Sequence, residues 1–534
     1  MHTRSVTHIG RTVWVGIATL MVLALAYAAW KNSSAFTSRI AYELAGPYTA
    51  DSPIYWAVGR GILNGLTPYR DLFETKPPGI FLISSLSLWL TGTMQIGALI
   101  QALLLALIPL SVVFAAWKEA RGHTEMTRWI LVGGAFLFGT SLALYVGERS
   151  GEFQVESFGA AFAIAYAALL FMSRGTISRR GIALAASLIV LSTGMKEPFL
   201  LSCLAIALLL CESRRAFFRG FVLPAMIAGV AGVVLLLSIG MWDGYVHVYI
   251  PEMFGRYGHG GEALWMRGLK FNVLFRDLSG FSPMLAYGIA GIAIAQTVMG
   301  FWRTRIARGV WNLLTVLAAL YLAALAVGTG NTYYNHHFVF AVGSFAALFL
   351  SFLRTAALHW KRGSFTRIVA MIVLLILLPT VNRRPLVDYK AQIAWYRDEQ
   401  QSVQNVAAEI DTILDRCGVE RYLFIGGNGG QPYGYTRHSP MGPLFFQFDH
   451  LLDDNHEKFR KEFVQSLHEA RFVVQKNFDL NVLTTETVLY LEQEFTKEPW
   501  PCAPSIESNG PYSFYFRKPW KGGSLVREPS RSIP

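Results

Sequence analysis

The residues with the clearest chemical potential lie in one polar stretch, residues 51–79, between apolar segments. It places three acids and a lysine, Asp51, Asp71, Glu74 and Lys76, within 26 residues. A carboxylate can take a proton from an attacking hydroxyl, and a lysine is a point charge suited to phosphate. The stretch therefore predicts acid–base chemistry beside a phosphate group.

Two of these residues also have purely structural interpretations, which the sequence leaves open. Asp51 precedes a Ser-Pro pair, a pattern typical of a helix start with proline just inside it, so Asp51 fits a helix cap. Lys76 precedes two prolines, whose fixed φ angles hold the backbone rigidly. Its alternative role is that of a lysine extending its charge to lipid headgroups.

Further candidates stand where apolar segments end or break. They are Glu152 and Glu156 in the turn 147–156, Lys196 at a break in the apolar run 181–211, Arg256 and His259 in the segment 242–280, and the neighbours His336 and His337. An ionisable residue at a broken membrane helix is functional by default. Adjacent histidines point apart on a helix, so the histidine pair does not predict a metal site.

The elements that must hold these residues are predicted by composition. The 534-residue chain is 53% hydrophobic and only 15% charged, and its mean hydropathy is +0.36, whereas soluble domains carry about 25% charged residues. This excludes disorder, a small disulfide scaffold and an ordinary cytosolic enzyme. The net charge of +12 comes from residues 1–381, with 29 basic and 15 acidic residues, so it belongs to segments between apolar runs and does not indicate nucleic acid.

Hydropathy predicts a polytopic α-helical membrane protein with about 11 transmembrane helices. The run 181–211 divides into two short spans, and the other predicted spans are 12–30, 94–117, 129–147, 157–173, 221–241, 281–302, 310–328, 336–353 and 367–381. The run 79–90 is shorter than the about 20 residues that a span needs, so we expect an interfacial or re-entrant helix there.

Charge predicts the orientation of these spans. With a cytoplasmic N-terminus, the six inner segments contain 18 Lys/Arg and three Asp/Glu. Basic residues prefer the cytoplasmic side, so the first loop (31–93) and residues 382–534 are expected outside the cytoplasm. We therefore expect a membrane domain over 1–381 and an extracytoplasmic domain over 382–534.

The C-terminal segment alternates between helical and strand-like patterns. Helices are expected over 388–417 and 454–470, and strands over 422–425, 444–448, 472–475 and 513–517. This alternation favours a small α/β domain. Cys417 and Cys502 can pair if this domain is extracytoplasmic, but sequence alone leaves their pairing open.

The polar stretch resembles the first periplasmic loop of a known superfamily. An Asp at a helix start (Asp51) is followed by Gly-x-x-Pro-Tyr-x-Asp, from Gly65 to Asp71, and by Lys-Pro-Pro-Gly, from Lys76 to Gly79. This order resembles the GT-C glycosyltransferases, polytopic enzymes that take a sugar from a polyprenyl-phosphate carrier. The nearest resemblance is to bacterial relatives of the protein O-mannosyltransferases and of the lipid A aminoarabinose transferase.

The resemblance implies an inverting transfer of a monosaccharide to a glycan, lipid or protein acceptor at the outer face of the bacterial inner membrane. It makes Asp51 the catalytic base and favours Glu152 over Glu156 as a second acid. The implied substrate-binding residues are Tyr55, Arg60, Asp71, Glu74, Lys76, Lys196, Arg256, His259, His336 and His337. No cofactor is required, although a divalent metal is compatible with the chemistry; no metal ligands are predicted.

Two other functions use similar features. A lipid-sugar flippase would also have many spans with charged residues, but the chain has no visible inverted repeat. An O-antigen ligase or polymerase would also use lipid-linked sugars, although its large functional loop is expected late in the chain. The sugar (hexose, arabinofuranose or amino sugar) and the acceptor stay open.

Overall fold

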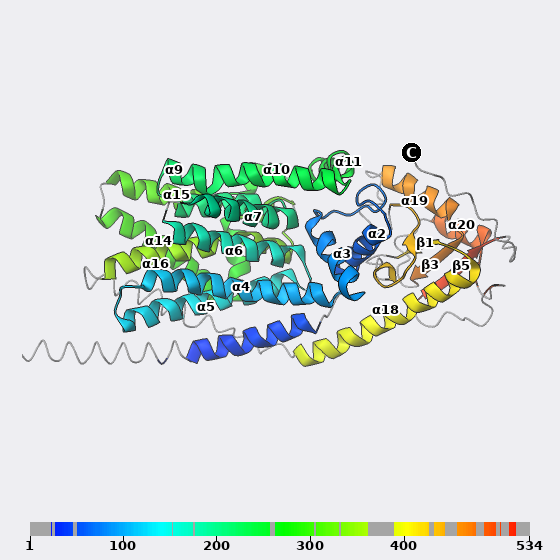
Figure 1. The fold of residues 1–534 in the computed structure, drawn as a ribbon, viewed down its shortest axis with the longest axis horizontal. Helices are drawn as coiled ribbons and strands as arrows, with labels where there is room; N and C mark the ends of the chain where they lie inside the picture. The colour runs from blue at the N-terminus through cyan, green and yellow to red at the C-terminus, as the bar shows by residue number, and fades with distance from the viewer. Residues whose placement is uncertain are drawn as a thin grey trace, which may run out of the picture.

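The computed structural model has three parts arranged along its long axis (Figure 1): a helical bundle, a middle layer of two short helices, and a small α/β domain. It describes residues 23, 27–45, 51–151, 153–174, 177–256, 262–303, 306–330, 333–360, 389–426, 432–443, 457–476, 485–497, 502 and 512–518.

Among these residues, six helices are long and apolar enough to cross a membrane, so the chain is a membrane protein. They cover Gln95–Ala120, Thr127–Ser150, Val155–Ser173, Arg214–Ser238, Gly309–Gly328 and Asn335–Ala357. The corresponding elements are α4 (Gln95–Ala120), α5 (Glu125–Ser150), α6 (Val155–Ser173), α9 (Arg214–Phe217) with η1 (Phe218–Val222) and α10 (Leu223–Ser238), α15 (Ile306–Gly328), and η4 (Asn335–Ala341) with α16 (Val342–Trp360).

The remaining predicted spans have mixed outcomes. The run 181–211 forms two helices, α7 (Arg179–Met195) and α8 (Phe199–Leu210), and the break falls at residues 196–198 as predicted. The span at 281–302 is α14 (Pro283–Arg303). The span at 367–381 and most of the span at 12–30 lie outside the described residues, so the total of 11 stays a prediction.

The first predicted loop begins later than expected. It was predicted from residue 31, but the chain is helical over 27–44. The polar side chains that suggested a loop find partners within this helix and beside it: Arg39 forms a buried ion pair with Glu43, one turn away. Asn32 Nδ2 donates to Ser141 Oγ on α5 at 3.2 Å. Charges that are paired in this way do not end a helix at a membrane surface.

The middle layer consists of α2 (Ser52–Leu63) and α3 (Gly79–Thr91), which pack closely on one another. Gly59 permits this approach, because a Cβ there would lie 2.7 Å from Ser84 Cβ. With 13 residues, α3 is about 20 Å long at 1.5 Å per residue, too short to cross a bilayer. The short helix expected at 79–90 is thus confirmed.

The segment 242–280, expected as a loop, is largely helical. It forms α11 (Trp242–Gly244), the π-helices η2 (Tyr245–Tyr249) and η3 (Pro251–Arg256), α12 (Leu264–Arg267) and α13 (Phe271–Phe281). One of its charges is satisfied by backbone carbonyls: the guanidinium of the buried Arg267 donates to those of Glu262, Gly328 and Thr329.

The C-terminal domain is an α/β unit, as predicted. Its elements are α18 (Tyr389–Cys417), β1 (Arg421–Ile425), η6 (Pro432–Gly434), β2 (Ser439–Pro440), α19 (Glu457–Glu469), β3 (Phe472–Lys476), α20 (Thr485–Glu494), β4 (Phe495–Lys497) and β5 (Tyr512–Arg517). The sheet order is β2-β1-β3-β5-β4, with β1 parallel to β2 and β3, and β5 antiparallel to β3 and β4. The strand expected at 444–448 lies outside the described residues. Cys417 and Cys502 form a disulfide, which closes the question left open by the sequence.

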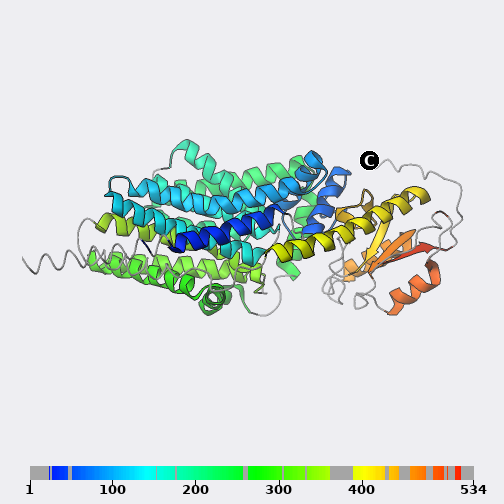
Figure 2. The ribbon, with the colours of Figure 1, turned by 90° about the horizontal axis from the view of Figure 1, so that it is seen from below.

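This domain is docked on the middle layer through a shared apolar core. Phe73 and Phe459 pack with ring centroids 4.4 Å apart, and the Phe73 amide donates to the Pro443 carbonyl at 2.8 Å. Trp56 of α2 meets Tyr435 edge-on at 5.1 Å. Figure 2 shows α18 extending from the end of the bundle along this junction to the sheet. The polar stretch 51–79 is therefore held between bundle and domain.

Candidate functional site

Asp51 directly precedes α2, but its carboxylate does not cap that helix. It occupies the N-cap position without a side-chain hydrogen bond to the helix amides. Oδ2 instead lies 3.9 Å from the Lys76 ammonium and 3.5 Å from the Tyr55 hydroxyl. The side chain is 29% exposed, so it is accessible to a substrate. The helix-cap interpretation is wrong for this carboxylate.

Lys76 is held by the fold of its own loop. The Tyr69 hydroxyl donates to the Lys76 carbonyl at 2.7 Å, and Tyr69 has φ +67°, in the left-handed region that is costly for a bulky residue. After the two prolines, Gly79 packs against the end of α7, where a Cβ would lie 2.6 Å from the Gly194 oxygen. The lysine is thus fixed beside the break between α7 and α8.

Lys196 occupies that break and is 8% exposed. Burial, and secondarily the positive charge of Lys76, lower the pKa of Lys196 to about 8, while Glu156, Glu197 and Glu74 act in the opposite direction. Two lysines from distant parts of the sequence therefore lie within one another's field. Such an arrangement is stabilised by an anion bound between them.

Glu156 is fully buried in the first turn of α6, and neither of its carboxylate oxygens has a hydrogen-bond partner among the described residues. Oε1 lies 3.9 Å from His336 Nε2. The N-terminal end of a helix dipole favours a negative charge at this position. Glu152, which the resemblance favoured, lies outside the described residues.

Two further groups complete the cluster. Glu74 is 3% exposed and accepts from the Thr75 hydroxyl at 3.2 Å. Burial is the main cause that raises the pKa of Glu74; the charge of Asp51 raises it further, and Lys76 opposes the rise. The Tyr55 hydroxyl donates to Gln154 Oε1 at 3.1 Å. No pattern in the sequence singled out Gln154, which is a lone amide just before α6.

Several predicted residues lie elsewhere. Asp71 is paired with Arg70 at 2.8 Å and accepts from the Thr67 amide. His337 is at the margin of the cluster: it is buried, its ring centroid lies 4.5 Å from that of His336, and it stacks on Phe340. The side chain of Arg256 and all of His259 lie outside what the structure describes. Arg60 faces the C-terminal domain, on the side of α2 away from this cluster.

Glu197, next to Lys196, has a supporting role. Its Oε1 accepts from the Tyr249 hydroxyl at 2.7 Å and from the Tyr245 hydroxyl at 3.3 Å. Both rings pack on Tyr69, with ring centroids 5.1 and 5.8 Å away. The helix break that carries Lys196 and the loop that carries Lys76 are therefore joined by one tyrosine cluster.

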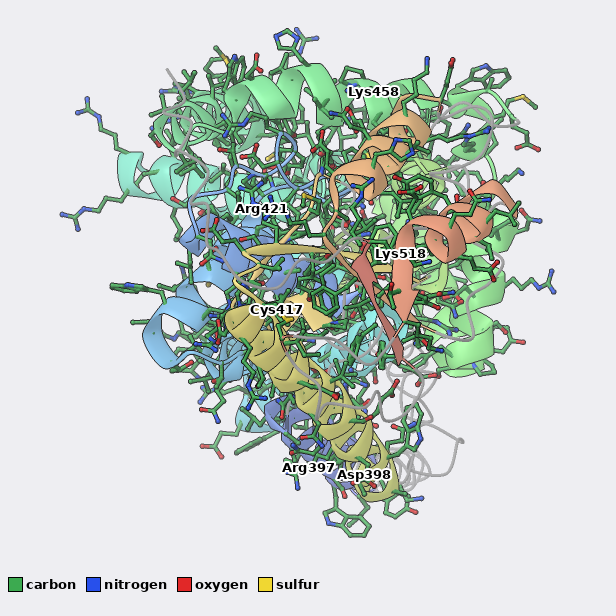
Figure 3. All side chains as sticks on the ribbon, turned by 90° about the vertical axis from the view of Figure 1, so that its right-hand side faces the viewer. Arg397, Asp398, Cys417, Arg421, Lys458 and Lys518 are labelled. Atoms are coloured by element: carbon green, nitrogen blue, oxygen red, sulfur yellow. A yellow bond between two sulfur atoms is a disulfide. The ribbon has the colours of Figure 1, made fainter. Side chains whose placement is uncertain are left out.

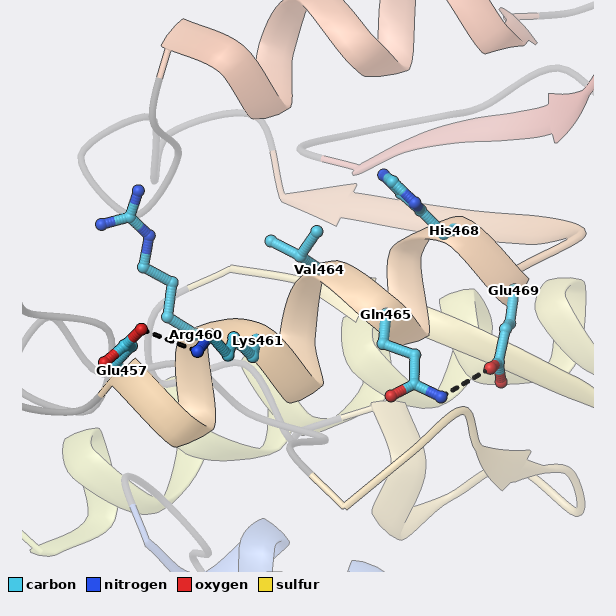
Figure 4. A pocket seen from close by; sticks show the side chains of 7 residues that line it. All are labelled: Glu457, Arg460, Lys461, Val464, Gln465, His468 and Glu469. Carbon is cyan, nitrogen blue, oxygen red and sulfur yellow. Dashed lines mark hydrogen bonds and ion pairs between the residues drawn. The ribbon is translucent and has the colours of Figure 1, made fainter.

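A surface cavity of about 700 Å³ lies away from these groups, along α19 (Figure 4). All its lining residues come from that single helix, and two of them form an ion pair, Lys461 Nζ to Glu457 Oε1 at 2.7 Å. It is an open, solvated helix face. Over the described part of the chain, no group of three or more His, Cys, Asp or Glu side chains could hold a metal ion.

Known proteins resemble this arrangement in fold. No family model and no curated protein matches the sequence. The crystal structure of ArnT from Cupriavidus metallidurans bound to undecaprenyl phosphate superposes with a TM-score of 0.50 at 13% identity, over 94% of this chain and 98% of that one. ArnT has the GT-C fold.

The chain has the GT-C fold. Weaker similarities extend to the Archaeoglobus fulgidus oligosaccharyltransferase complexed with zinc and sulfate, at 13% identity over 85% of this chain and 68% of that one, with a TM-score of 0.43. The archaeal oligosaccharyltransferase AglB from the same organism, with an inhibitory peptide and a dolichol-phosphate, gives 12% identity over 86% and 69%, also with a TM-score of 0.43.

Proposed function

We propose that this chain is a glycosyltransferase that moves a monosaccharide from a polyprenyl-phosphate carrier to an acceptor hydroxyl outside the cytoplasm. The observation that carries the proposal is the convergence of an accessible carboxylate, Asp51, with two fixed lysines, Lys76 and Lys196. A base and a pair of cations are the groups that this reaction needs at its two ends.

In the proposed reaction, the acceptor oxygen attacks the anomeric carbon of the sugar. Its proton passes to the Asp51 carboxylate as the new C–O bond forms. The bond from the anomeric carbon to the phosphate oxygen breaks, and the electron pair leaves with the carrier phosphate. Lys76 and Lys196 stabilise the negative charge that grows there, an effect strongest in the transition state. Attack opposite the leaving phosphate inverts the anomeric centre.

Glu156 is our candidate for the second acid of the turn 147–156, with Glu152 as the alternative. Its buried carboxylate lies 3.9 Å from His336 Nε2 and within the electrostatic reach of Lys196. Glu156 would keep His336 oriented toward the donor sugar. Its negative charge would also offset part of the positive charge of the two lysines. Tyr55 and Glu74 would position Asp51, because both lie within its electrostatic reach.

We also propose the topology derived from charge: 11 spans within a membrane domain over 1–381, and an extracytoplasmic domain over 382–534, in the bacterial inner membrane. The Cys417–Cys502 disulfide supports this orientation, because disulfides persist in oxidising compartments. The site then faces outward, where lipid-linked sugars, rather than nucleotide sugars, are the expected donors.

The test is sugar transfer by the purified chain in nanodiscs. Polyprenyl-phosphate monosaccharides with a labelled sugar should yield labelled acceptor, whereas diphosphate-linked oligosaccharides should not. Exchange between the leaflets of vesicles without transfer would identify a flippase, and transfer only from diphosphate donors would identify a ligase. NMR of the product linkage reports inversion or retention at the anomeric carbon.

A further inference from the structure

A groove of about 610 Å³ lies on the opposite face of α2, between the membrane domain and the C-terminal domain. We call it the α2–α18 groove. Trp56 and Arg60, one helical turn apart on α2, form one wall, and Gln400 and Gln404 of α18 form the other. Arg397 of α18 also lines the groove. Figure 3 labels it toward the opposite end of this helix from Cys417.

Arg60 is the most informative residue of the groove. It is half-buried, and its Nε has no hydrogen-bond partner among the residues that the structure describes. Burial lowers the pKa of Arg60, and Asp411 only partly opposes this. Asp411 is already engaged, because it accepts from the Arg437 amide at 3.0 Å. A partly desolvated guanidinium that faces an open groove is stabilised by a further anion.

The aromatic and amide residues of the lining suit a carbohydrate. Trp56 and Tyr435 meet edge-on at 5.1 Å and give the groove a rigid aromatic wall. The glutamine side chains offer amide donors and acceptors that match sugar hydroxyls. The volume falls within the range of small-molecule sites, about 300–1,000 Å³.

We propose that the α2–α18 groove binds an anionic carbohydrate, a sugar with a carboxylate or phosphate group, which serves as the acceptor of the transfer. The acceptor role rests on the proposed function, whereas the binding does not. A planar guanidinium pairs bidentately with either anion. Trp56 stands five residues after Asp51, about 8 Å along the axis of α2, so the acceptor role requires a glycan long enough to extend from the groove around the start of α2 to the base.

Binding is tested on the full chain in nanodiscs by isothermal titration calorimetry. The probes are glucuronate and glucose 6-phosphate, with glucose and inorganic phosphate as comparators. We expect the anionic sugars to bind at least tenfold more tightly than either comparator. Arg60→Gln and Arg397→Gln should each weaken binding by about tenfold, converted from roughly 1.4 kcal/mol per charged hydrogen bond.

Matched variants separate this site from general effects. Arg460→Gln, on α19 of the same domain, should leave binding unchanged. Arg60→Lys keeps the charge and should recover part of the affinity, with an unchanged melting temperature. Equal binding of glucose and glucuronate, or unaltered binding in Arg60→Gln, overturns the proposal. So does loss of sugar binding when phosphatidylglycerol replaces phosphatidylcholine in the nanodisc, because a lipid headgroup would then be the occupant.

The acceptor role has its own readout. Arg60→Gln should raise the KM for an anionic acceptor about tenfold while the KM for the donor and the single-turnover rate at saturating acceptor stay unchanged. An unchanged acceptor KM overturns the acceptor role. If the chain transfers no sugar from any donor but binds anionic sugars through Arg60, the proposed function fails and the groove stands as a binding site.

Discussion

Asp51 combines an accessible carboxylate with no hydrogen bond to the backbone amides of the helix that it precedes. Removing its charge should therefore leave α2 intact and remove only the base. We expect Asp51→Asn to lower single-turnover transfer by about 10²–10⁴-fold with carrier binding retained. The control is Asp243→Asn. Asp243 is an exposed acid of α11, and this variant should keep the wild-type rate of transfer. Retention of more than a tenth of the rate, with a loss of about 1 kcal/mol in stability, would restore the helix-cap role.

Lys76 separates phosphate chemistry from a generic sugar site. Lys76→Ala should weaken polyprenyl-phosphate binding and slow transfer together, because the lysine acts on both the bound carrier and the growing charge. Lys76→Arg should recover only part of the carrier binding and of the transfer rate, since the planar guanidinium of arginine does not replace the compact charge of the lysine ammonium. Carrier binding and single-turnover transfer measure the two effects. Unchanged values of both in the alanine variant would leave Lys76 as a headgroup anchor.

Lys196 should make carrier binding depend on pH. Its pKa is lowered to about 8, so its charge is complete below that pH and is lost as the pH rises through it. A phosphate monoester is fully ionised there, since its second pKa is about 6. We expect the affinity for undecaprenyl phosphate to fall by up to about tenfold per pH unit above 8, because binding must then take up a proton. Lys196→Met should abolish this dependence of carrier affinity on pH. The control variant Lys270→Met should retain it.

The sequence identified the residues of the first loop because Asp51 and Lys76 lie in one local motif. For the turn 147–156 it favoured Glu152, which lies outside the described residues, whereas the acid whose burial the structure shows is Glu156. That burial depends on α6 starting at residue 155, which tertiary packing decides. Arg60 was expected among the substrate-binding residues without a more exact place; it lines the α2–α18 groove, and helical periodicity puts it on the opposite face of α2 from Tyr55.

At the scale of elements, the contact between α3 and α7 sets the distance between the two lysines. Gly79→Ala would drive a Cβ against the Gly194 carbonyl, a backbone atom that cannot yield easily. We expect a loss of about 1–3 kcal/mol in stability and weaker carrier binding, measured by thermal unfolding and lipid binding. Gly194→Ala is the matched control, because its Cβ would meet nothing within 4 Å. Equal effects of the two variants would contradict the role of this contact.

Apolar periodicity was sufficient to predict most helices and three strands of the sheet, since the length and composition of a segment are local properties of the sequence. It was also sufficient for the break at residues 196–198, where charge and proline coincide. It failed at 31–44, where Arg39 and Glu43 neutralise one another inside a helix. It failed again in the segment 242–280, where short helices depend on contacts with the bundle and with Tyr69 rather than on their own pattern.

At the scale of the molecule, the orientation of the chain follows from its basic segments. A periplasm-active reporter fused after Val381 should be active, and one inserted at Gly122 should be inactive, because the segment around residue 122 is among the basic inner ones. A cytoplasm-active reporter should give the reverse pattern. Activity of the periplasmic reporter at residue 122 would mean that α3 crosses the membrane and that every later loop is inverted.

The pair of lysines has a consequence for turnover. A polyprenyl-phosphate sugar is a phosphodiester with one negative charge, whereas the spent carrier is a monoester with nearly two at neutral pH. Lys76 and Lys196 are two neighbouring cations, and such a pair binds the doubly charged monoester more strongly than the singly charged diester. Under the proposed function, the chain is therefore inhibited by its own lipid product. Departure of that lipid into the bilayer, rather than formation of the glycosidic bond, then sets the pace of each cycle.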